Sequence, residues 1–173
     1  MSQTGTASGD VATRMSELVG KYLTFQLGSE GYGLQILKVQ EIIGIMPITR
    51  VPRTPDYLRG VINLRGKVIP VIELRRKFGM PPAEETERTC IIVVQVETDD
   101  QPITMGILVD EVSEVIDIPE RSLEPAPTFG RGVNSSFILA MGKLEDRVVI
   151  LLDLDKVLTA KEKVALETAA AEK

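Results

Sequence analysis

The sequence predicts an all-β protein with short helices, in which two related small barrels of about five strands each pack together and a C-terminal helix follows. Short apolar, β-branched segments recur along the chain, and turns rich in Gly, Pro and acidic residues separate them, which is typical of strands. Parts of the two halves also resemble each other, which indicates an internal repeat. Each repeat is too short for a wide barrel or a full sandwich, so a small closed or nearly closed barrel fits it best.

The first half begins with a polar segment and continues with strand patterns. We expect a flexible tail over residues 1–20, where Ser, Thr, Gly and Ala are frequent. The first barrel unit is expected at about 22–80, with β segments YLTFQL and LQILKVQEII and two runs that flank the turn motif Asn63, Leu64, Arg65 and Gly66. Between them, residues 54–60 read TPDYLRG, in which Thr54 can cap a helix and Gly60 can end it, so one or two helical turns are expected there.

The polar connector 81–88 separates this unit from a second one at about 88–158, and together residues 21–158 form one domain. The β segments of the second unit are CIIVVQVE, PITMGILV, DEVSEVIDI, FILAMGKL and VVILLDLDKVL, interrupted by a Pro-rich loop at 123–136. A helix is expected at 159–173, because Thr159-Ala160-Lys161-Glu162 matches a capping box and Ala, Leu, Glu and Lys follow it.

The repeat is clearest when residues 143–158 are aligned with 63–78: apolar residues coincide at seven of sixteen positions. A second alignment places 106–116 on 33–43. At the tip of the shared hairpin, Arg65 lies opposite Glu145, which has the opposite charge. We therefore interpret Arg65 as a residue that the hairpin does not require and that contacts something outside the fold.

Composition and charge exclude several classes. A content of 43% apolar residues is ample for a buried core, and a net charge of −5 with a pI near 4.9 argues against nucleic acid as the main partner. The single cysteine, Cys90, cannot form an intrachain disulfide. We expect a cytoplasmic protein, because the first residues lack signal-peptide features and no apolar run reaches the roughly 18 residues of a membrane span.

Chemistry that needs histidine is excluded, since the chain has none: neither a Ser-His-Asp triad, nor a Cys-His nucleophile, nor a histidine metal site can form. We expect no catalytic residue, no metal and no cofactor. An enzyme that acts through Asp153 or Asp155 remains an alternative, although a cleft would have to position these carboxylates. A small double-barrel module that binds nucleic acid or the ribosome is another alternative, although 4% aromatic residues and no tryptophan supply few stacking platforms.

Aliphatic side chains are unusually dense over twelve residues. They are Leu34, Ile36, Leu37, Val39, Ile42, Ile43 and Ile45. Small barrels have small interiors, so we expect part of this set to pack between the two units and leave open whether the rest is core or is exposed and seeks a partner.

Four segments resemble one family: YGLQILKVQEI, TPDYLRGVINLRGKVIPVIELRRKFG, GILVDEVSEVI and RVVILLDLDKVL are similar to the CheW chemotaxis coupling proteins and to the regulatory domain of chemotaxis histidine kinases. The resemblance covers about residues 22–158, and the NLRG turn is its most specific part. It implies two SH3-like five-stranded barrels on a shared hydrophobic interior, and an adaptor with no reaction of its own that links receptors and kinase into arrays. It leaves open whether the pathway controls swimming chemotaxis or surface motility.

The implied partners are the cytoplasmic tip of a methyl-accepting chemoreceptor, in the groove between the barrels, and the regulatory domain of the histidine kinase CheA, on the first barrel. The protein itself would bind no nucleic acid and would not insert into the membrane, but would be recruited to receptor arrays at its inner face. The implied receptor-binding residues are Leu34, Leu37, Glu41, Arg65, Val109, Val112 and Val115. The implied kinase-binding residues are Val39, Ile45 and Gly60, where Gly60 would let a backbone approach closely.

A physical reason accompanies the receptor assignment. A receptor tip is a coiled-coil-like helix pair, so it offers an apolar stripe with charged edges. A groove of branched aliphatic side chains with an arginine at its rim complements that pattern.

Overall fold

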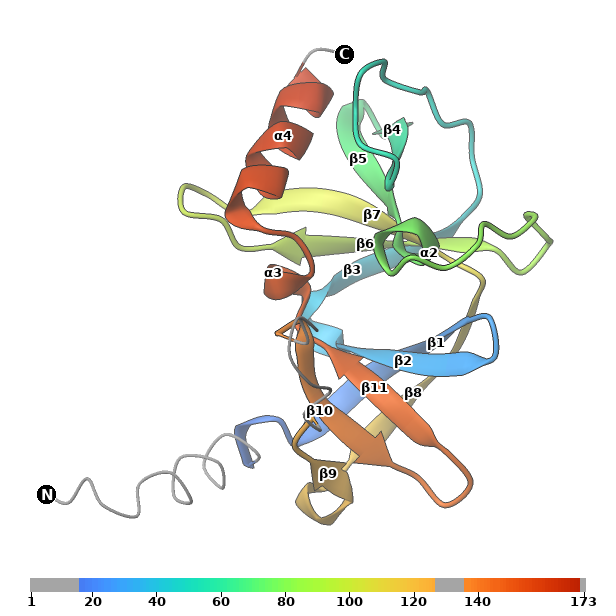
Figure 1. The fold of residues 1–173 in the computed structure, drawn as a ribbon, viewed down its shortest axis with the longest axis vertical. Coiled ribbons are helices and arrows are strands. Elements are labelled where there is room, and N and C mark those ends of the chain that lie inside the picture. The colour runs from blue at the N-terminus through green and yellow to red at the C-terminus, as the bar shows by residue number, and fades with distance from the viewer. Residues whose placement is uncertain (1–15, 127–135, 172–173) are drawn as a thin grey trace, which may run out of the picture.

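Two β-sheets stacked end to end make up most of the molecule (Figure 1). The structure is a computed structural model that describes residues 16–126 and 136–171. Sheet A contains, in spatial order, β8 (Glu111–Ile118), β1 (Gly20–Leu27), β2 (Glu30–Gln35), β11 (Val148–Leu152), β10 (Ile138–Lys143) and β9 (Leu123–Glu124). Sheet B contains β3 (Val39–Gly44), β6 (Cys90–Val96), β7 (Ile103–Val109), β5 (Lys67–Glu73) and β4 (Leu58–Leu64).

Each sheet curls into a small SH3-like barrel, barrel A and barrel B, as the sequence predicts. In sheet B the closure is visible in the pairing: after β3 the chain crosses to the opposite edge strand, where Thr49 exchanges two backbone hydrogen bonds of 2.8 Å with Val61 of β4. In sheet A the two-residue strand β9 makes the equivalent contact with β10. Counting β9, barrel A has six strands where five were expected.

The sheets exchange strands between the two halves of the chain. Strands β1 and β2 come from the first half but lie in sheet A, where β2 pairs in parallel with β11; strands β6 and β7 come from the second half but lie in sheet B, where β7 pairs in parallel with β5. The prediction that 22–80 and 88–158 each form one barrel was wrong in this respect. The repeat identifies equivalent strands, but local sequence patterns carry no information about which half supplies a strand's neighbour.

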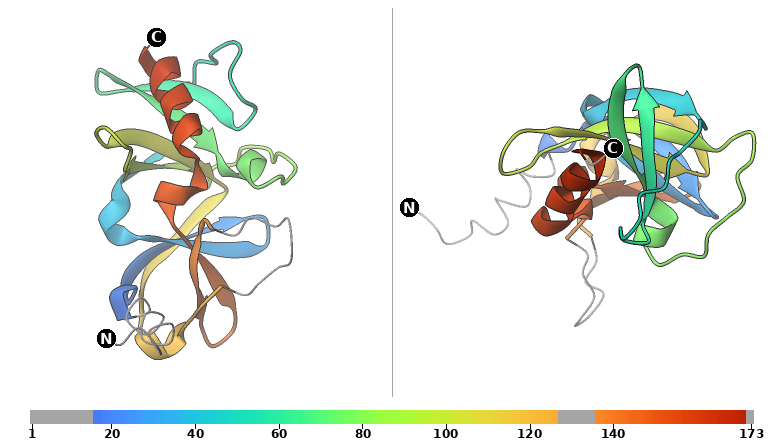
Figure 2. Two further views of the ribbon diagram at one scale, coloured as in Figure 1. Left: turned by 60° about the vertical axis from the view of Figure 1, so that its left-hand side comes forward. Right: turned by 90° about the horizontal axis from the view of Figure 1, so that it is seen from above.

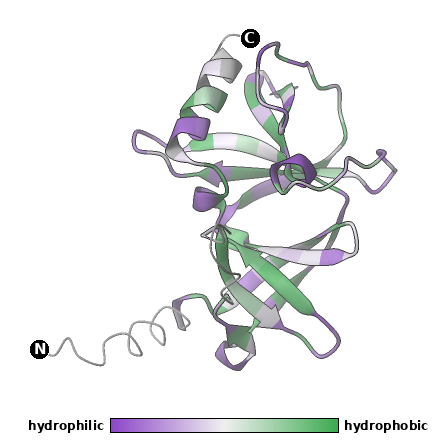
Figure 3. Ribbon diagram, in the orientation of Figure 1, coloured by the Kyte–Doolittle hydropathy of each residue, from purple (hydrophilic) through white to green (hydrophobic). Residues whose placement is uncertain are grey.

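The hairpin repeat is confirmed by the structure. β4 and β5 lead into α2 (Leu74–Lys77), and β10 and β11 lead into α3 (Leu154–Val157). Both helices bury their first residue, Leu74 and Leu154, which the alignment places opposite each other. Charged residues occupy the rest of α2, which is therefore purple among mostly green strands in Figure 3.

Two short connections complete the order of elements: the 3-10 turns η1 (Ile36–Lys38) and η2 (Glu120–Ser122). The helical turns expected at 54–60 do not form. Residues 56 and 57 make a turn, and β4 begins at Leu58, so Gly60 lies inside a strand. The Leu58 amide donates to the Pro55 carbonyl at 3.1 Å and closes this turn, while the Thr54 hydroxyl donates to the Val51 carbonyl at 2.7 Å instead of capping a helix.

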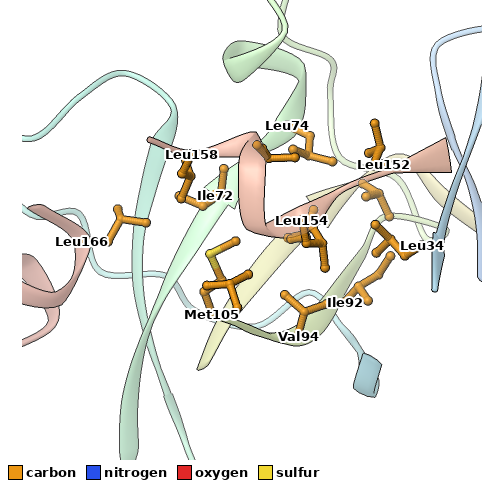
Figure 4. Close-up of a cluster of buried hydrophobic side chains, with 14 of the residues drawn as sticks. Leu34, Ile72, Leu74, Ile92, Val94, Met105, Leu152, Leu154, Leu158 and Leu166 are labelled. Carbon is orange, nitrogen blue, oxygen red and sulfur yellow. The ribbon is translucent and has the colours of Figure 1, made fainter. Parts of the chain in front are cut away.

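The largest hydrophobic core lies between the barrels, as predicted (Figure 4). It combines side chains from sheet A, such as Leu34 and Leu152, with side chains from sheet B, such as Ile92 and Met105, and all four are at most 1% exposed. Each barrel also has a smaller core of its own. Truncating one of these buried side chains to alanine costs about 2–5 kcal/mol, so the shared core joins the barrels firmly.

The C-terminal helix α4 (Ala160–Ala171) packs beside barrel B and contacts β5 (Figure 2). The predicted capping box is confirmed: the Thr159 amide donates to the Glu162 carboxylate at 2.8 Å, and the Glu162 amide donates to the Thr159 hydroxyl at 3.1 Å. Leu166 is fully buried in the shared core, and Lys77 of α2 forms an ion pair with Glu162 at 2.8 Å. Helix α4 is thus an integral part of the domain.

Of the predicted variable segments, residues 1–15 of the tail and 127–135 of the loop lie outside the described part of the chain. The tail prediction ends at residue 20, but Ser16 and Glu17 are helical and β1 begins at Gly20.

Candidate protein-interaction surfaces

The predicted receptor-binding residues divide sharply by burial. Leu37 is 96% exposed and Val115 is 49% exposed, whereas Val112 packs partly against the shared core. Leu34 and Val109 are almost fully buried there and have no surface to offer a partner. The assignment of these last two as contact residues was therefore wrong, because each is directed inward near the end of a central strand.

Strand register relates the exposed members to the buried ones. On sheet A, Leu34 of β2 pairs with Leu23 of β1, and Leu23 pairs with Val115 of β8, so the three form one row across the sheet. Leu37 follows the end of β2 by two residues, in η1. Leu37 therefore lies where the chain leaves sheet A for sheet B, and Val115 lies on edge strand β8 of sheet A, in the row that ends with Leu34.

Arg65 and Glu41, the two polar residues that the resemblance assigns to the receptor surface, form an ion pair with each other. Glu41 is on edge strand β3, and Arg65 is at the tip of the β4–β5 hairpin. Arg65 (φ 51°) and Gly66 (φ 89°) are both left-handed, which is the geometry of a two-residue type I′ turn, and the Gly66 amide donates to the Asn63 side chain at 2.7 Å. Leu64 packs against the core of barrel B.

Barrel A repeats this arrangement. Arg147, near the tip of the β10–β11 hairpin, lies 3.9 Å from Glu114 of edge strand β8. In each barrel, therefore, an arginine from one hairpin and a glutamate from the opposite edge strand approach each other. Arg65 thus has a partner within the fold as well, but its side chain stays 68% exposed and accessible to a partner outside it.

The predicted kinase-binding residues also differ in exposure. Ile45, just after β3, is 39% exposed, and Val39 is partly buried against the shared core. Gly60 is buried, and a Cβ atom at that position would lie 2.3 Å from the Thr49 carbonyl oxygen. The close backbone approach predicted for Gly60 is thus a contact within the chain, with the strand that closes barrel B.

One exposed residue on this surface was missed. Ile42 is 43% exposed, because residues 39–44 of edge strand β3 alternate between partly buried and exposed positions. The signal was available in the alternation Gln40, Ile42, Gly44, but Ile42 stood among seven aliphatic residues that could not be divided by sequence. With Ile45, it gives barrel B an apolar edge.

The two carboxylates considered for catalysis are used within the fold. Asp153 caps α3 by accepting the Asp155 amide at 3.1 Å, and Asp155 accepts a hydrogen bond from Lys38 at 3.0 Å. Within residues 16–126 and 136–171, no group of three or more Cys, Asp or Glu side chains is arranged to hold a metal ion. In the same part of the chain, no helix combines the length and apolarity that crossing a bilayer demands.

The geometry defines a class: a double-barrel protein-interaction module with exposed apolar residues and, in each barrel, a glutamate of an edge strand paired with an arginine of a hairpin. The family description "CheW-like domain" matches residues 21–162. The chain belongs to the CheW family, and it is a chemotaxis coupling adaptor.

Relatives and solved structures agree with this assignment. The chain is 38% identical to the chemotaxis protein CheW of Klebsiella aerogenes, over 92% of this chain and 95% of that protein. It is 36% identical to the chemotaxis protein CheW of Helicobacter pylori, over 83% and 84% of the two chains. The crystal structure of the scaffolding protein TtCheW from Thermoanaerobacter tengcongensis is similar, with a TM-score of 0.73 and 36% identity over 84% of this chain and 97% of that one.

Proposed function

We propose that this protein couples the cytoplasmic tip of a chemoreceptor to the regulatory domain of a chemotaxis histidine kinase and performs no reaction of its own. The observation that carries the proposal is Leu37, which is 96% exposed in η1, where the chain crosses from one barrel to the other, together with the half-exposed Val115 on edge strand β8. An isolated leucine with nearly all of its surface in water gains free energy when a partner covers it.

The receptor tip is assigned to Leu37 and Val115, with Val112 on the same strand as Val115 and the Glu41–Arg65 pair on barrel B as the polar contact. A helix pair with an apolar stripe and charged edges fits such a surface. Fewer apolar anchors are available than the sequence indicated, and a few anchors are sufficient, because a small number of residues carries most of the energy of an interface.

The kinase regulatory domain is assigned to the edge of barrel B formed by Ile42, Ile45 and the accessible part of Val39. An edge strand presents unpaired backbone groups and, here, apolar side chains, both of which suit contact with another barrel. Binding two partners at once would recruit the protein from the cytoplasm to receptor arrays at the inner face of the membrane.

The test is a pair of substitutions that separates the partners. Leu37→Ala should weaken binding to a receptor cytoplasmic fragment by roughly 1–2 kcal/mol and leave kinase-domain binding unchanged; Ile45→Ala should do the reverse. Titration calorimetry with each partner measures both. Val164→Ala, at an exposed valine on α4, is the matched control and should change neither affinity.

All three positions are exposed, so the free energy of unfolding should change by less than about 0.5 kcal/mol in each variant. If wild-type protein binds neither partner, or if Leu37→Ala and Ile45→Ala weaken both partners equally, the proposed division of surfaces is wrong.

A further inference from the structure

The chain crosses from sheet A to sheet B at η1, and one carboxylate holds this crossover in place. The Lys38 ammonium donates to Asp155 Oδ2 at 3.0 Å, and the Glu97 amide donates to Asp155 Oδ1 at 2.8 Å. Asp155 lies in α3, directly after β11 of barrel A, and Glu97 directly follows β6 of barrel B. These three residues, here called the η1 clasp, therefore tie the crossover to both barrels.

The return crossover, from β7 to β8, has a clasp of the same design. Arg75 of α2 donates to both carboxylate oxygens of Asp110, at 2.9 and 2.6 Å, and the Gly28 amide donates to Asp110 Oδ2 at 2.7 Å. The hydrogen bonds from Arg75 hold the pKa of Asp110 below its usual value, against the opposing effect of burial, and the Gly28 amide adds to the lowering. Again one carboxylate joins the crossover, a helix from one barrel and a turn from the other.

The two clasps occupy equivalent helix positions with reversed charge. Arg75 and Asp155 are the second residues of α2 and α3, and the hairpin repeat aligns them. The crossovers differ by one residue, however: the alignment places Asp110 opposite Leu37, not opposite Lys38. In the second crossover, Asp110 itself binds Arg75. In the first crossover, the position aligned with Asp110 is the exposed Leu37, and the following residue, Lys38, forms the clasp.

Ile36 and Val39 pack partly against the shared core on either side of Leu37, and the clasp adds the polar contact that holds the middle of η1. This element is a single 3-10 turn without a side-chain cap, and the Val39 amide donates back to the Ile36 carbonyl. Such short turns are weakly stable by themselves. The Lys38 and Asp155 side chains are each more than two-thirds shielded from solvent, so their ion pair is stronger than a fully exposed one.

We propose that Lys38 and Asp155 are positioning residues for the receptor surface: the η1 clasp orders the turn so that Leu37 is presented in the direction in which the receptor tip docks. The inference rests on the proposed function of Leu37. Ordering an anchor before binding reduces the conformational entropy that association would otherwise remove, so the clasp raises affinity by acting through Leu37.

Hydrogen exchange tests the ordering directly, and it does not depend on any partner. In Lys38→Met, exchange of the Val39 amide should accelerate, while amides in the middle of β6 and β7 keep their wild-type rates. Lys38→Arg retains the ion pair and should restore protection at Val39. Lys156→Met removes the same charge from an exposed neighbour of Asp155 and should change nothing.

Binding to a receptor cytoplasmic fragment tests the consequence. Lys38→Met should raise Kd about three- to tenfold, and Lys38→Arg should recover most of that loss. A double-mutant cycle with Leu37→Ala gives the sharper result: once Leu37 is truncated, Lys38→Met should have almost no further effect, because the two residues act as one unit.

Each outcome decides the inference. Additive effects in the cycle, or unchanged exchange at Val39 in Lys38→Met, would overturn it. If wild-type protein does not bind the receptor fragment, the proposed function fails and the positioning role fails with it, whereas the exchange measurement still shows whether the clasp orders η1. Loss of protection throughout β6 and β7 would mean that Lys38 serves global stability, which also contradicts the proposal.

Discussion

At the scale of single residues, exposure divided side chains that the sequence could not distinguish. Leu34 and Leu37 are both leucines in the same apolar segment, yet one is fully buried and the other 96% exposed. The difference arises because β2 ends at Gln35 and η1 changes the direction of the chain. The sequence predicted that aliphatic residues form the surface, but it did not predict which of these residues are exposed to solvent.

Arg65 has one partner within the chain, Glu41, and a proposed partner outside it, the receptor. The contributions of the two contacts can be measured separately. Because the Arg65 side chain is mostly exposed, its ion pair with Glu41 should contribute little, and Arg65→Ala should change the free energy of unfolding by less than about 0.5 kcal/mol. Binding to a receptor fragment should weaken by roughly 1–3 kcal/mol if Arg65 is an anchor. Denaturant unfolding and titration calorimetry measure the two effects.

The control for Arg65 is Arg121→Ala, which removes another exposed arginine, on η2, and should alter neither quantity. A variant that melts early but binds normally in its folded fraction would show that Arg65 serves the hairpin and not the receptor.

Gly60 is predicted to be essential to the fold. Its backbone has φ of 150°, and an alanine Cβ would lie 2.3 Å from the Thr49 carbonyl oxygen and 2.8 Å from Ile48 Cγ2. Gly60→Ala should therefore destabilise the protein by more than about 2 kcal/mol. Denaturant unfolding tests this, with Gly44→Ala as the control, since nothing lies within 4 Å of a Cβ placed at Gly44.

The effect of Gly60→Ala on kinase binding should follow the folded fraction alone. A variant that keeps wild-type stability but no longer binds the kinase domain would instead show that Gly60 contacts the kinase directly, as the sequence resemblance implied.

At the scale of elements, hairpins and helix caps were the most predictable features. These features depend on residues that are close together in the chain. They include the NLRG turn, the β4–β5 and β10–β11 hairpins of the repeat and the capping box at Thr159, and all of them are present. The prediction of helical turns at 54–60 was wrong for a non-local reason. Strand β4 begins within this segment because it pairs with β5 and with Thr49. Tertiary pairing overrode local capping signals.

The Asp110 clasp should make the free energy of unfolding depend on pH in the acidic range. The folded pKa of Asp110 is lowered, so its contribution is present above the ordinary value of 3.8 and is lost as pH falls through the lower folded value. Asp110→Asn should therefore reduce the free energy of unfolding at neutral pH, and the difference from wild type should shrink steadily in acid. Denaturant unfolding at a series of pH values measures it; a difference that stays constant down to pH about 2 would show that Asp110 does not act through its charge.

At the scale of the whole molecule, the sequence predicted two equivalent barrels and a shared core, but not the exchange of strands between them. The equivalence was visible because both copies preserve the same apolar positions. Pairing partners were not visible, since the parallel contacts of β2 with β11 and of β5 with β7 join residues distant in sequence. These contacts make each barrel a product of both halves.

Two fragments test this dependence. Residues 1–83 and 84–173 should each remain unfolded alone, because each lacks strands of both sheets, and should regain β-sheet structure when mixed. Circular dichroism and one cooperative unfolding transition of the mixture would report reconstitution. A fragment that folds alone to a cooperative, native-like state would contradict the exchanged topology.

The parallel pairing of Gly31 with Val149 has a further consequence for biosynthesis. On the ribosome, sheet B has all of its strands as soon as Val109 has left the exit tunnel, whereas sheet A must wait for Leu152. Strands β1 and β2 emerge first, but β2 can pair with its neighbour β11 only after the last strand has emerged. During most of translation this early hairpin therefore presents an unpaired edge in the crowded cell, and nascent-chain chaperones should engage it there.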